Sequence, residues 1–306
     1  MKRLISLFLA AAVVVVFSGC SAIAPQPAPI QLKDGLGRQV TLSKPAQKIV
    51  SLAPSNTEIL FAVGAGKQVV GRDDFSDFPA EAKAIQSIGG VQAYNFEAIA
   101  SLQPDLVLAA GINTAEQVKS LEDLKIPVYY LANPTDMNGL YANLKIVGQL
   151  SGHDKQAADL ADSLLKRVQA VESRVAKASG TPKVFYEIDG TDPSKPWTAG
   201  PGTFVDLLIK KAGGVNVGNA LSSDWAQISL EALLLADPDI VVLGDASYGL
   251  TPEQVKARPG WDGIKAVKNN KVLLFDDNLI SRPGPRLVDG LEALVKIIHP
   301  ELASAQ

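Results

Sequence analysis

The chain has few of the residues on which enzymes, metal centres and disulfide scaffolds depend. Its 306 residues include one cysteine, Cys20, and two histidines, His153 and His299. A single cysteine excludes an internal disulfide, so the fold must be held by core packing alone. No histidine and carboxylate group has zinc-ligand spacing, and no G-x-S-x-G motif marks a serine hydrolase. No lysine or arginine cluster stands out, so nucleic acid is not an expected partner.

Glycine-rich turns are present, but they lack the spacing that binds nucleotides. The GAG of residues 64–66 fails the G-x-G-x-x-G spacing, and no Walker lysine follows the GPGT of residues 200–203. The acid pairs at 73–74 and 276–277 follow apolar segments and suit a divalent cation in isolation. Acids in such places more often cap helices or solvate loops. A nucleotide- or metal-dependent α/β enzyme is the alternative from another class, but we predict that the chain is not an enzyme and holds no metal.

The first residues are typical of a secretory signal peptide. Lys2 and Arg3 form a positive flank, and residues 4–17 are apolar apart from Ser6. These 14 residues are fewer than the roughly 20 that a helix needs to cross a bilayer core, and small residues follow them. We predict a signal peptide over residues 1–19 and an exported protein. Without Lys2 and Arg3 the chain keeps 27 basic and 32 acidic side chains, a formal charge of −5.

Cys20 stands directly after the predicted cleavage point, and its surroundings resemble the bacterial lipoprotein box. In lipoproteins the signal peptidase cuts before this cysteine, whose sulfur carries a lipid. Phe17 stands where leucine is usual. An ordinary signal peptide that contains a cysteine by chance is the alternative, but a lone exported cysteine has no disulfide partner. We predict a lipid on Cys20, a proline-rich tether over residues 20–29, and a location on the cell membrane, facing the periplasm or the cell exterior.

Two segments of the chain nearly repeat each other. Residues 97–108 read EAIASLQPDLVL and residues 231–242 read EALLLADPDIVV, with the same spacing from glutamate to proline. A second pair precedes them in the same order, TEILFAVGAGKQVVG from Thr57 and TFVDLLIKKAGGVNVG from Thr203. Each member of that pair predicts a helix that ends at glycine and leads into a short strand. Copies separated by about a domain length predict two similar lobes and exclude a solenoid.

Short apolar runs alternate with helices in both halves of the chain, at 48–52, 105–109, 128–131, 183–188, 240–244 and 272–276. Such strands are typical of parallel sheets covered on both faces. We therefore predict an α/β fold with an N-terminal lobe over residues 30–153 and a C-terminal lobe over residues 180–306. Between them, residues 154–179 have apolar side chains at helical spacing and predict one long helix that joins the lobes.

From Asp34 onward the chain resembles a known class of binding protein. The resemblance covers nearly all of residues 30–299, through the segments DGLGRQVTLSKPAQKIVSLAPSNTEILFAVGAGKQVVG, DDFSDFP, NFEAIASLQPDLVLA, WTAGPGTF, DWAQISLEALLLADPDIVVLG and SRPGPR. These are similar to the substrate-binding proteins that serve ABC importers of vitamin B12, ferric siderophores and haem. The resemblance implies a monomer with a small-molecule ligand in the cleft between its lobes, and permease subunits as partners. A lobe interface is also the default ligand site on physical grounds.

The resemblance implies that the ligand contacts come from loops facing the cleft, at Pro54, Asp74, Phe75, Tyr94, Trp197, Trp225, Tyr248, Arg282 and Pro283. Phe75 and Trp225 fall where cobalamin-binding members place aromatic rings, and Arg282 matches a ligand-contacting arginine. Flat apolar walls suit a flat macrocycle. We therefore expect cobalamin or another corrinoid as the ligand and no further cofactor, and we expect Trp261 in the core.

The match to the B12 binders is incomplete, which leaves ferric siderophores as an alternative ligand. Two of their cleft tryptophans fall at Val91 and Ala110, and Tyr94 offers a replacement for the first alone. Anionic siderophores favour several basic side chains. Arg282 and Arg72 are the candidates for that role, which weakens the siderophore alternative.

Haem is the third ligand considered, because an iron porphyrin needs a tyrosine or histidine as axial ligand. His153 and His299 are expected at the surface, in a helix start and in the C-terminal helix. Tyr94 and Tyr248 are the tyrosines that keep this alternative open.

Glu97 and Glu231 stand at equivalent places in the two repeats. In the family that the chain resembles, one exposed glutamate of each lobe pairs with arginines of the permease. A carboxylate in the first turn of a helix is also stabilised by the helix dipole, by about 0.3–1 kcal/mol, but that effect does not account for the match between the lobes. We predict that both glutamates dock the permease. Glu58, at another helix start, is expected to be an ordinary surface carboxylate.

Overall fold

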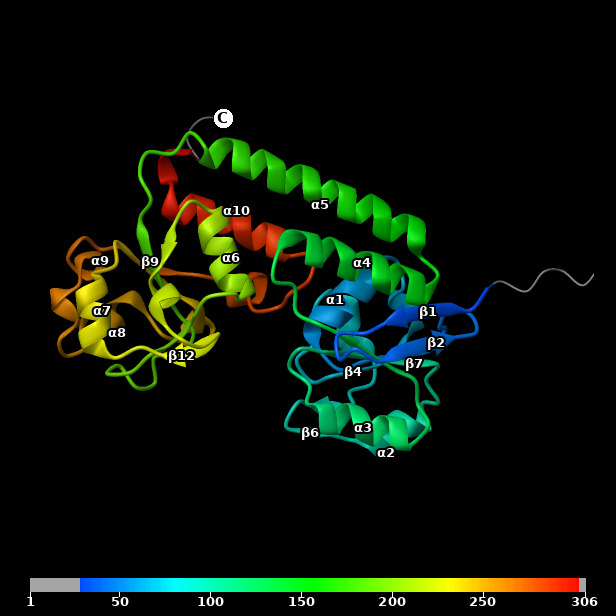
Figure 1. Cartoon of the computed structure of the whole chain (residues 1–306). Coiled ribbons are helices and arrows are strands. Elements are labelled where there is room, and N and C mark those ends of the chain that lie inside the picture. Colours follow the sequence, from blue (N-terminus) through cyan, green and yellow to red (C-terminus); the bar gives the residue numbers. More distant parts are fainter. Residues whose placement is uncertain (1–27, 303–306) are drawn as a thin grey trace, which may run out of the picture.

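The computed structural model describes residues 28–302. Two α/β lobes lie side by side beneath one long helix (Figure 1). Each lobe contains a four-stranded parallel sheet, so the prediction of two similar α/β lobes is confirmed. The predicted signal peptide, Cys20 and most of the predicted tether lie outside the described residues. Within residues 28–302, no helix has both the length and the apolar character needed to cross a membrane.

The sheet of the first lobe has the strand order β4-β3-β7-β8, all parallel. Its strands are β3 (Ile49–Ser51), β4 (Val69–Arg72), β7 (Leu106–Ala110) and β8 (Val128–Leu131). Two antiparallel pairs flank it, β1 (Ile30–Lys33) with β2 (Gln39–Leu42) and β5 (Gly89–Gly90) with β6 (Ala93–Tyr94). The helices of this lobe are α1 (Pro54–Ala62), α2 (Phe96–Ser101), α3 (Ala115–Asp123) and α4 (Met137–Ser151).

The sheet of the second lobe has the order β11-β9-β13-β14, again all parallel. Its strands are β9 (Lys183–Glu187), β11 (Val215–Asn216), β13 (Ile240–Leu243) and β14 (Val272–Leu274). An antiparallel pair, β10 (Trp197–Ala199) with β12 (Trp225–Gln227), lies beside it. The helices are α6 (Phe204–Lys211), α7 (Leu230–Ala236), α8 (Pro252–Lys256), α9 (Lys265–Lys268) and α10 (Leu287–Ile298).

The sequence repeat corresponds to the same structural unit in each lobe. Helix α2 leads into β7 in the first lobe, and α7 leads into β13 in the second. Both helices are capped by a polar side chain, since Asn95 accepts a hydrogen bond from the N–H of Ala98 and Ser229 accepts one from the N–H of Ala232. The aspartate of each Pro-Asp pair accepts a hydrogen bond from a backbone N–H at the start of a neighbouring strand. Asp105 accepts from Lys48, directly before β3, over 3.0 Å, and Asp239 accepts from Lys183, the first residue of β9, over 2.8 Å.

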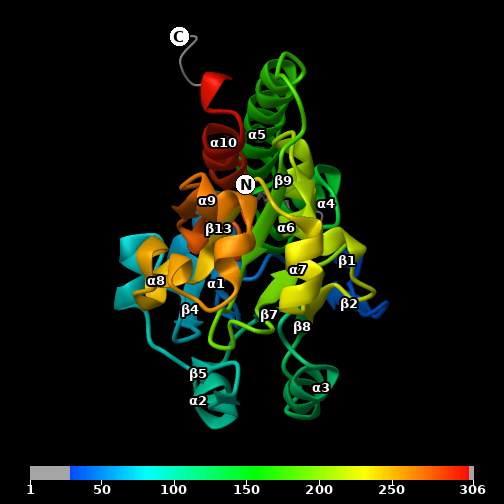
Figure 2. The same cartoon turned by 90° about the vertical axis from the view of Figure 1, so that its left-hand side faces the viewer.

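The predicted connecting helix is α5 (Asp154–Val175), which ends earlier than the expected residue 179. It runs along the top of both lobes in Figure 1 and lies beside α10 in Figure 2. Its buried stripe includes Leu164, Val168 and Val171 and packs against α4 and α10. One long helix without glycine or proline is a stiff connection, unlike a pair of extended crossover strands.

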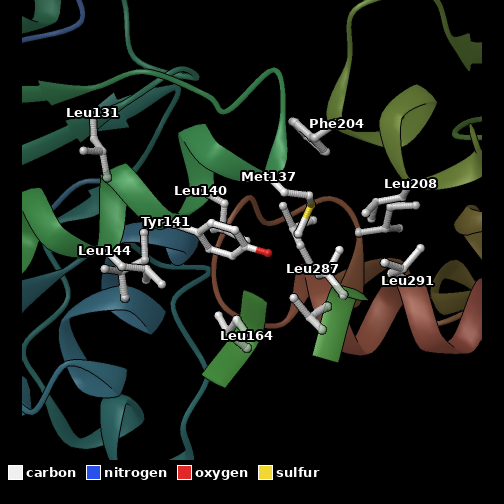
Figure 3. Packing of buried hydrophobic residues seen from close by; sticks show 14 of the residues in the cluster. Leu131, Met137, Leu140, Tyr141, Leu144, Leu164, Phe204, Leu208, Leu287 and Leu291 are labelled. Carbon is white, nitrogen blue, oxygen red and sulfur yellow. The ribbon is translucent and has the colours of Figure 1, made fainter. Parts of the chain in front are cut away.

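One hydrophobic cluster runs through both lobes. It joins Leu140 and Leu144 of α4 to Leu208 of α6 and to Leu287 and Leu291 of α10. Figure 3 shows these side chains meeting between the lobes, near Leu164 of α5. Two smaller clusters fill the outer part of each lobe separately. Because the central cluster is shared, opening the lobes widely would expose apolar surface to water.

Candidate functional site

A cavity of about 420 Å³ lies between the lobes, and we refer to it as the cleft. Its walls come mainly from the loops that follow β3, β4, β7 and β8 in the first lobe and β9, β13 and β14 in the second. In parallel sheets these loops gather at the carboxyl ends of the strands, which is where open α/β folds bind ligands. The volume lies within the range of about 300–1,000 Å³ that small-molecule sites occupy.

Six of the predicted ligand contacts line the cleft: Pro54, Phe75, Trp225, Tyr248, Arg282 and Pro283. The three aromatic rings among them are accessible to a ligand. Phe75 is 64% exposed, Trp225 41% and Tyr248 90%. Phe75 belongs to the first lobe, and the other two belong to the second. The ring of Trp225 lies 5.5 Å from that of Phe204, which also lines the cleft.

The other three predicted contacts lie outside the lining. Asp74 accepts a hydrogen bond from the hydroxyl of Ser87. Trp197 is 41% exposed and shares one face of the β10–β12 pair with Trp225. Tyr94 is buried, and its hydroxyl donates to the carbonyl of Leu52 over 2.6 Å. Burial raises the pKa of Tyr94 to about 12, so this phenol stays protonated as a structural donor.

Two acids of the cleft lining, the buried Asp73 and the partly buried Asp277, were interpreted from sequence as ordinary caps or loop residues. Asp73 accepts the N–H of Phe75 over 2.9 Å and lines the cleft. Asp277 lines it too and accepts the hydroxyl of Tyr186 over 2.6 Å. Burial raises the pKa of both carboxyls. Their position in the sequence is the signal that could have found them, since each acid pair lies within three residues of the end of a strand at the cleft edge. Only one member of each pair, Asp73 and Asp277, lines the cleft.

The expectation that Glu58 is a surface carboxylate is wrong. Its side chain is buried, at 3% exposure, and it pairs with two arginines of the C-terminal segment. Arg286 donates from Nε over 2.8 Å and from Nη2 over 2.5 Å, and Arg282 donates from Nη1 over 3.3 Å. Arg282 also donates to Asp77 over 2.6 Å. We call these four residues, Glu58, Asp77, Arg282 and Arg286, the interlobe bracket.

The remaining sequence-based expectations have mixed outcomes. Trp261 is fully buried, as predicted, and its indole donates to the carbonyl of Pro193. The surface placement of His299 is wrong, since it is 1% exposed and its ring contacts Glu301 and the carbonyl of Gly213. His153 is partly buried. Neither histidine lines the cleft, and among the described residues no group of three or more histidine, cysteine and acidic side chains is arranged to hold a metal ion.

Glu97 and Glu231 both lie exposed in the first turn of the repeated helices, α2 and α7. Hydrogen bonds from its own backbone N–H and from Ser229 lower the pKa of Glu231, so that carboxylate is ionised. The two glutamates therefore occupy equivalent structural positions on separate lobes, as the repeat implied. They lie outside the cleft lining.

Two parallel-sheet lobes, a rigid connecting helix and a cleft at the carboxyl ends of the strands define a two-lobe solute-binding protein. The sequence pattern of the periplasmic binding proteins matches residues 49–279, and the chain belongs to that family. Proteins of this family bind solutes and are not enzymes.

Two relatives and one solved structure illustrate the family resemblance. The "Uncharacterized ABC transporter substrate-binding lipoprotein YvrC" of Bacillus subtilis is 34% identical, over 89% of this chain and 86% of its own. The "Cobalamin-binding protein" of Halobacterium salinarum is 28% identical, over 97% of this chain and 85% of its own. The periplasmic heme-binding protein RhuT of Roseiflexus sp. RS-1, in apo form, is 27% identical and superposes with a TM-score of 0.76, over 84% of this chain and 99% of its own.

Proposed function

We propose that this protein captures a corrinoid of the vitamin B12 type outside the cytoplasm and delivers it to the permease of an ABC importer. The family supports the role of an importer substrate-binding protein, and the side chains of the cleft support the choice of ligand. It includes a lipid anchor on Cys20, a monomeric state, and no cofactor apart from the transported ligand.

One observation carries the choice of ligand. Phe75 and Trp225 come from different lobes and expose large parts of their rings in the same cleft. A flat macrocycle between the lobes would contact an aromatic ring on each side, which provides large contact area at low entropic cost. The cleft is small for a whole corrinoid, so the periphery of such a ligand would remain outside it.

The relatives support the proposal without deciding it. One relative is named for cobalamin, and one structural neighbour is named for haem. Haem needs an axial ligand for its iron. Tyr248 is the tyrosine of the cleft lining that is exposed enough for this role. The hydroxyl of Tyr94 is already hydrogen-bonded in the core. Ferric siderophores of anionic type need cations, and Arg282 is the cation that lines the cleft.

The test is a calorimetric titration of residues 21–306 with cyanocobalamin, with a ferric hydroxamate and haemin as comparison ligands. We expect one-to-one binding of cyanocobalamin with a Kd at or below about 1 μM, or some −8 kcal/mol. Binding of a comparison ligand in place of cyanocobalamin would overturn the corrinoid proposal and leave the importer class intact.

A pair of tryptophan variants then locates the ligand. Trp225→Ala is expected to weaken cyanocobalamin binding by about tenfold or more, as loss of an aromatic contact typically does. Trp197→Ala removes the neighbouring tryptophan of the same strand pair, which does not line the cleft, and is expected to change the Kd by less than about threefold. Equal losses in both variants would mean that the ligand extends along the shared face of the strand pair from Trp225 to Trp197, beyond the cleft lining.

A further inference from the structure

Arg282 is the cation that lines the cleft in the described part of the chain, and it is already paired. Its side chain is 13% exposed. Its Nη1 atom lies 2.6 Å from a carboxylate oxygen of Asp77 and 3.3 Å from one of Glu58. A guanidinium held by two carboxylates at hydrogen-bond distance is largely neutralised before any ligand arrives.

The interlobe bracket as a whole has no net charge. Glu58 is shared between Arg282 and Arg286, so two carboxylates face two guanidiniums. Burial by itself would raise the pKa of Asp77, but the hydrogen bond and positive charge of Arg282 bring it below its usual value. Asp77 is therefore ionised at neutral pH and offsets the charge of Arg282.

The other charged groups of the cleft lining are acids. They are Asp73 and Asp277, one from each lobe. Arg72 is the nearest other candidate cation in the sequence pattern, but it donates to the carbonyls of Ala82 and Asp73 and does not line the cleft. An anionic ligand would thus meet carboxyl groups without a free cation to balance its charge.

We propose that Asp77 is a specificity-determining residue, which neutralises Arg282 and thereby makes the cleft reject anionic ligands in favour of ligands without net negative charge. The amide or hydroxyl groups of an accepted ligand would donate hydrogen bonds to Asp73 and Asp277. This inference deepens the proposed function, because the peripheral amides of a corrinoid are donors of that kind, whereas the propionates of haem are anions.

Asp77 is better suited to a test than its partner Glu58. The side chain of Asp77 is 52% exposed and pairs with Arg282 alone, whereas Glu58 is buried against two arginines. Replacing Asp77 with asparagine keeps the shape of the side chain and removes its charge. Glu81→Gln is the matched control, since Glu81 is exposed on a nearby 3₁₀ turn, lies outside the cleft lining, and changes the net charge equally.

The experiment measures the Kd of haemin, the anionic probe, and of cyanocobalamin for wild type, Asp77→Asn and Glu81→Gln, each as residues 21–306, which include both lobes. Asp77→Asn is expected to tighten haemin binding by roughly tenfold, because the partly buried guanidinium of Arg282 would then be free to pair with a propionate of haemin. The gain should shrink as salt rises, since it is electrostatic. Cyanocobalamin binding by Asp77→Asn and haemin binding by Glu81→Gln should stay within about threefold of wild type.

The inference is overturned if the Kd of haemin is the same for Asp77→Asn as for wild type. It is also overturned if neither wild type nor Asp77→Asn binds haemin. An equal gain in Glu81→Gln also overturns it, since the effect would then come from net charge alone. Asp77→Ser, which removes the charge with a smaller side chain, should reproduce the gain. Failure of the proposed function is seen separately, as a lack of cyanocobalamin binding by wild type.

Discussion

The carboxylate of Glu58, on the first helix of one lobe, is held in a two-bond ion pair by the guanidinium of Arg286, which immediately precedes α10 on the other side of the cleft. The bonds are 2.8 Å from Nε to Oε2 and 2.5 Å from Nη2 to Oε1. The ring of Phe78 lies 4.0 Å from the same guanidinium. Together with the hydrophobic cluster that both lobes share, this ion pair links the two sides of the cleft, so movement of the lobes on ligand binding is expected to be small.

Removing the carboxylate of Glu58 should destabilise the protein strongly. Glu58→Ala leaves Arg282 and Arg286, both at most 14% exposed, without their shared partner. Breaking a buried ion pair on one side typically costs about 3–5 kcal/mol. We expect a loss of that size in the free energy of unfolding, measured by urea denaturation. Glu81→Ala, at an exposed site, should change it by less than about 0.5 kcal/mol, and a similarly small loss for Glu58→Ala would show that the bracket does not stabilise the fold.

The stability of the protein should fall as pH rises towards neutrality, because of Glu187. Burial raises the pKa of Glu187 to about 7, against its ordinary 4.5, although Arg258 donates two hydrogen bonds to it. Between these two values the folded state binds more protons than the unfolded state, so the free energy of unfolding decreases with increasing pH. The contribution is present below about pH 4.5 and lost as pH rises through about 7, with a size on the order of 3 kcal/mol.

Glu187→Gln tests this pH dependence, since glutamine keeps the shape and cannot ionise. Urea unfolding of wild type and variant between pH 4.5 and 8 should show a steeper decline for wild type. Asp245, which lies close by, also has its pKa raised by burial and contributes a slope of the same sign to both proteins. Parallel curves for the two proteins would contradict the assignment of the slope to Glu187.

Glu97 and Glu231, the equivalent glutamates of the two lobes, are predicted to be needed for transport but not for ligand binding. Glu97→Ala combined with Glu231→Ala should abolish ligand uptake by cells while leaving the calorimetric Kd unchanged, because both residues lie outside the cleft. Glu116→Ala with Glu253→Ala is a matched control, since these are exposed first-turn glutamates of α3 and α8. Full uptake by the first double variant, or a loss of affinity, would exclude the docking role.

A lipid on Cys20 is predicted to attach the protein to the membrane. Cys20→Ser should move the protein from the membrane fraction to the soluble fraction of expressing cells, because a serine oxygen does not receive the lipid. Fractionation with antibody detection measures this. A variant that remains in the membrane fraction would contradict lipidation at Cys20 and point to another means of attachment.

The two similar lobes could be predicted from the sequence because the patterns that indicate them are local in the chain. The helix caps, the Pro-Asp pairs and the apolar strands recur in the same order in both halves, and each depends on residues within a few positions of one another. Trp261 was also placed correctly in the core. The partners in the ion pairs could not be predicted from the sequence, since Glu58 lies more than two hundred positions from both Arg282 and Arg286.

The sequence by itself therefore determined the family, the two α/β lobes, the connecting helix and the equivalence of Glu97 and Glu231, since periodicity and short motifs specify secondary structure and its order. Tertiary structure alone decided which member of each acid pair lines the cleft, that Tyr94 is a core donor, and that Arg282 pairs with Asp77 and Glu58. The physical reason is that burial and electrostatic pairing depend on which distant segments meet in space.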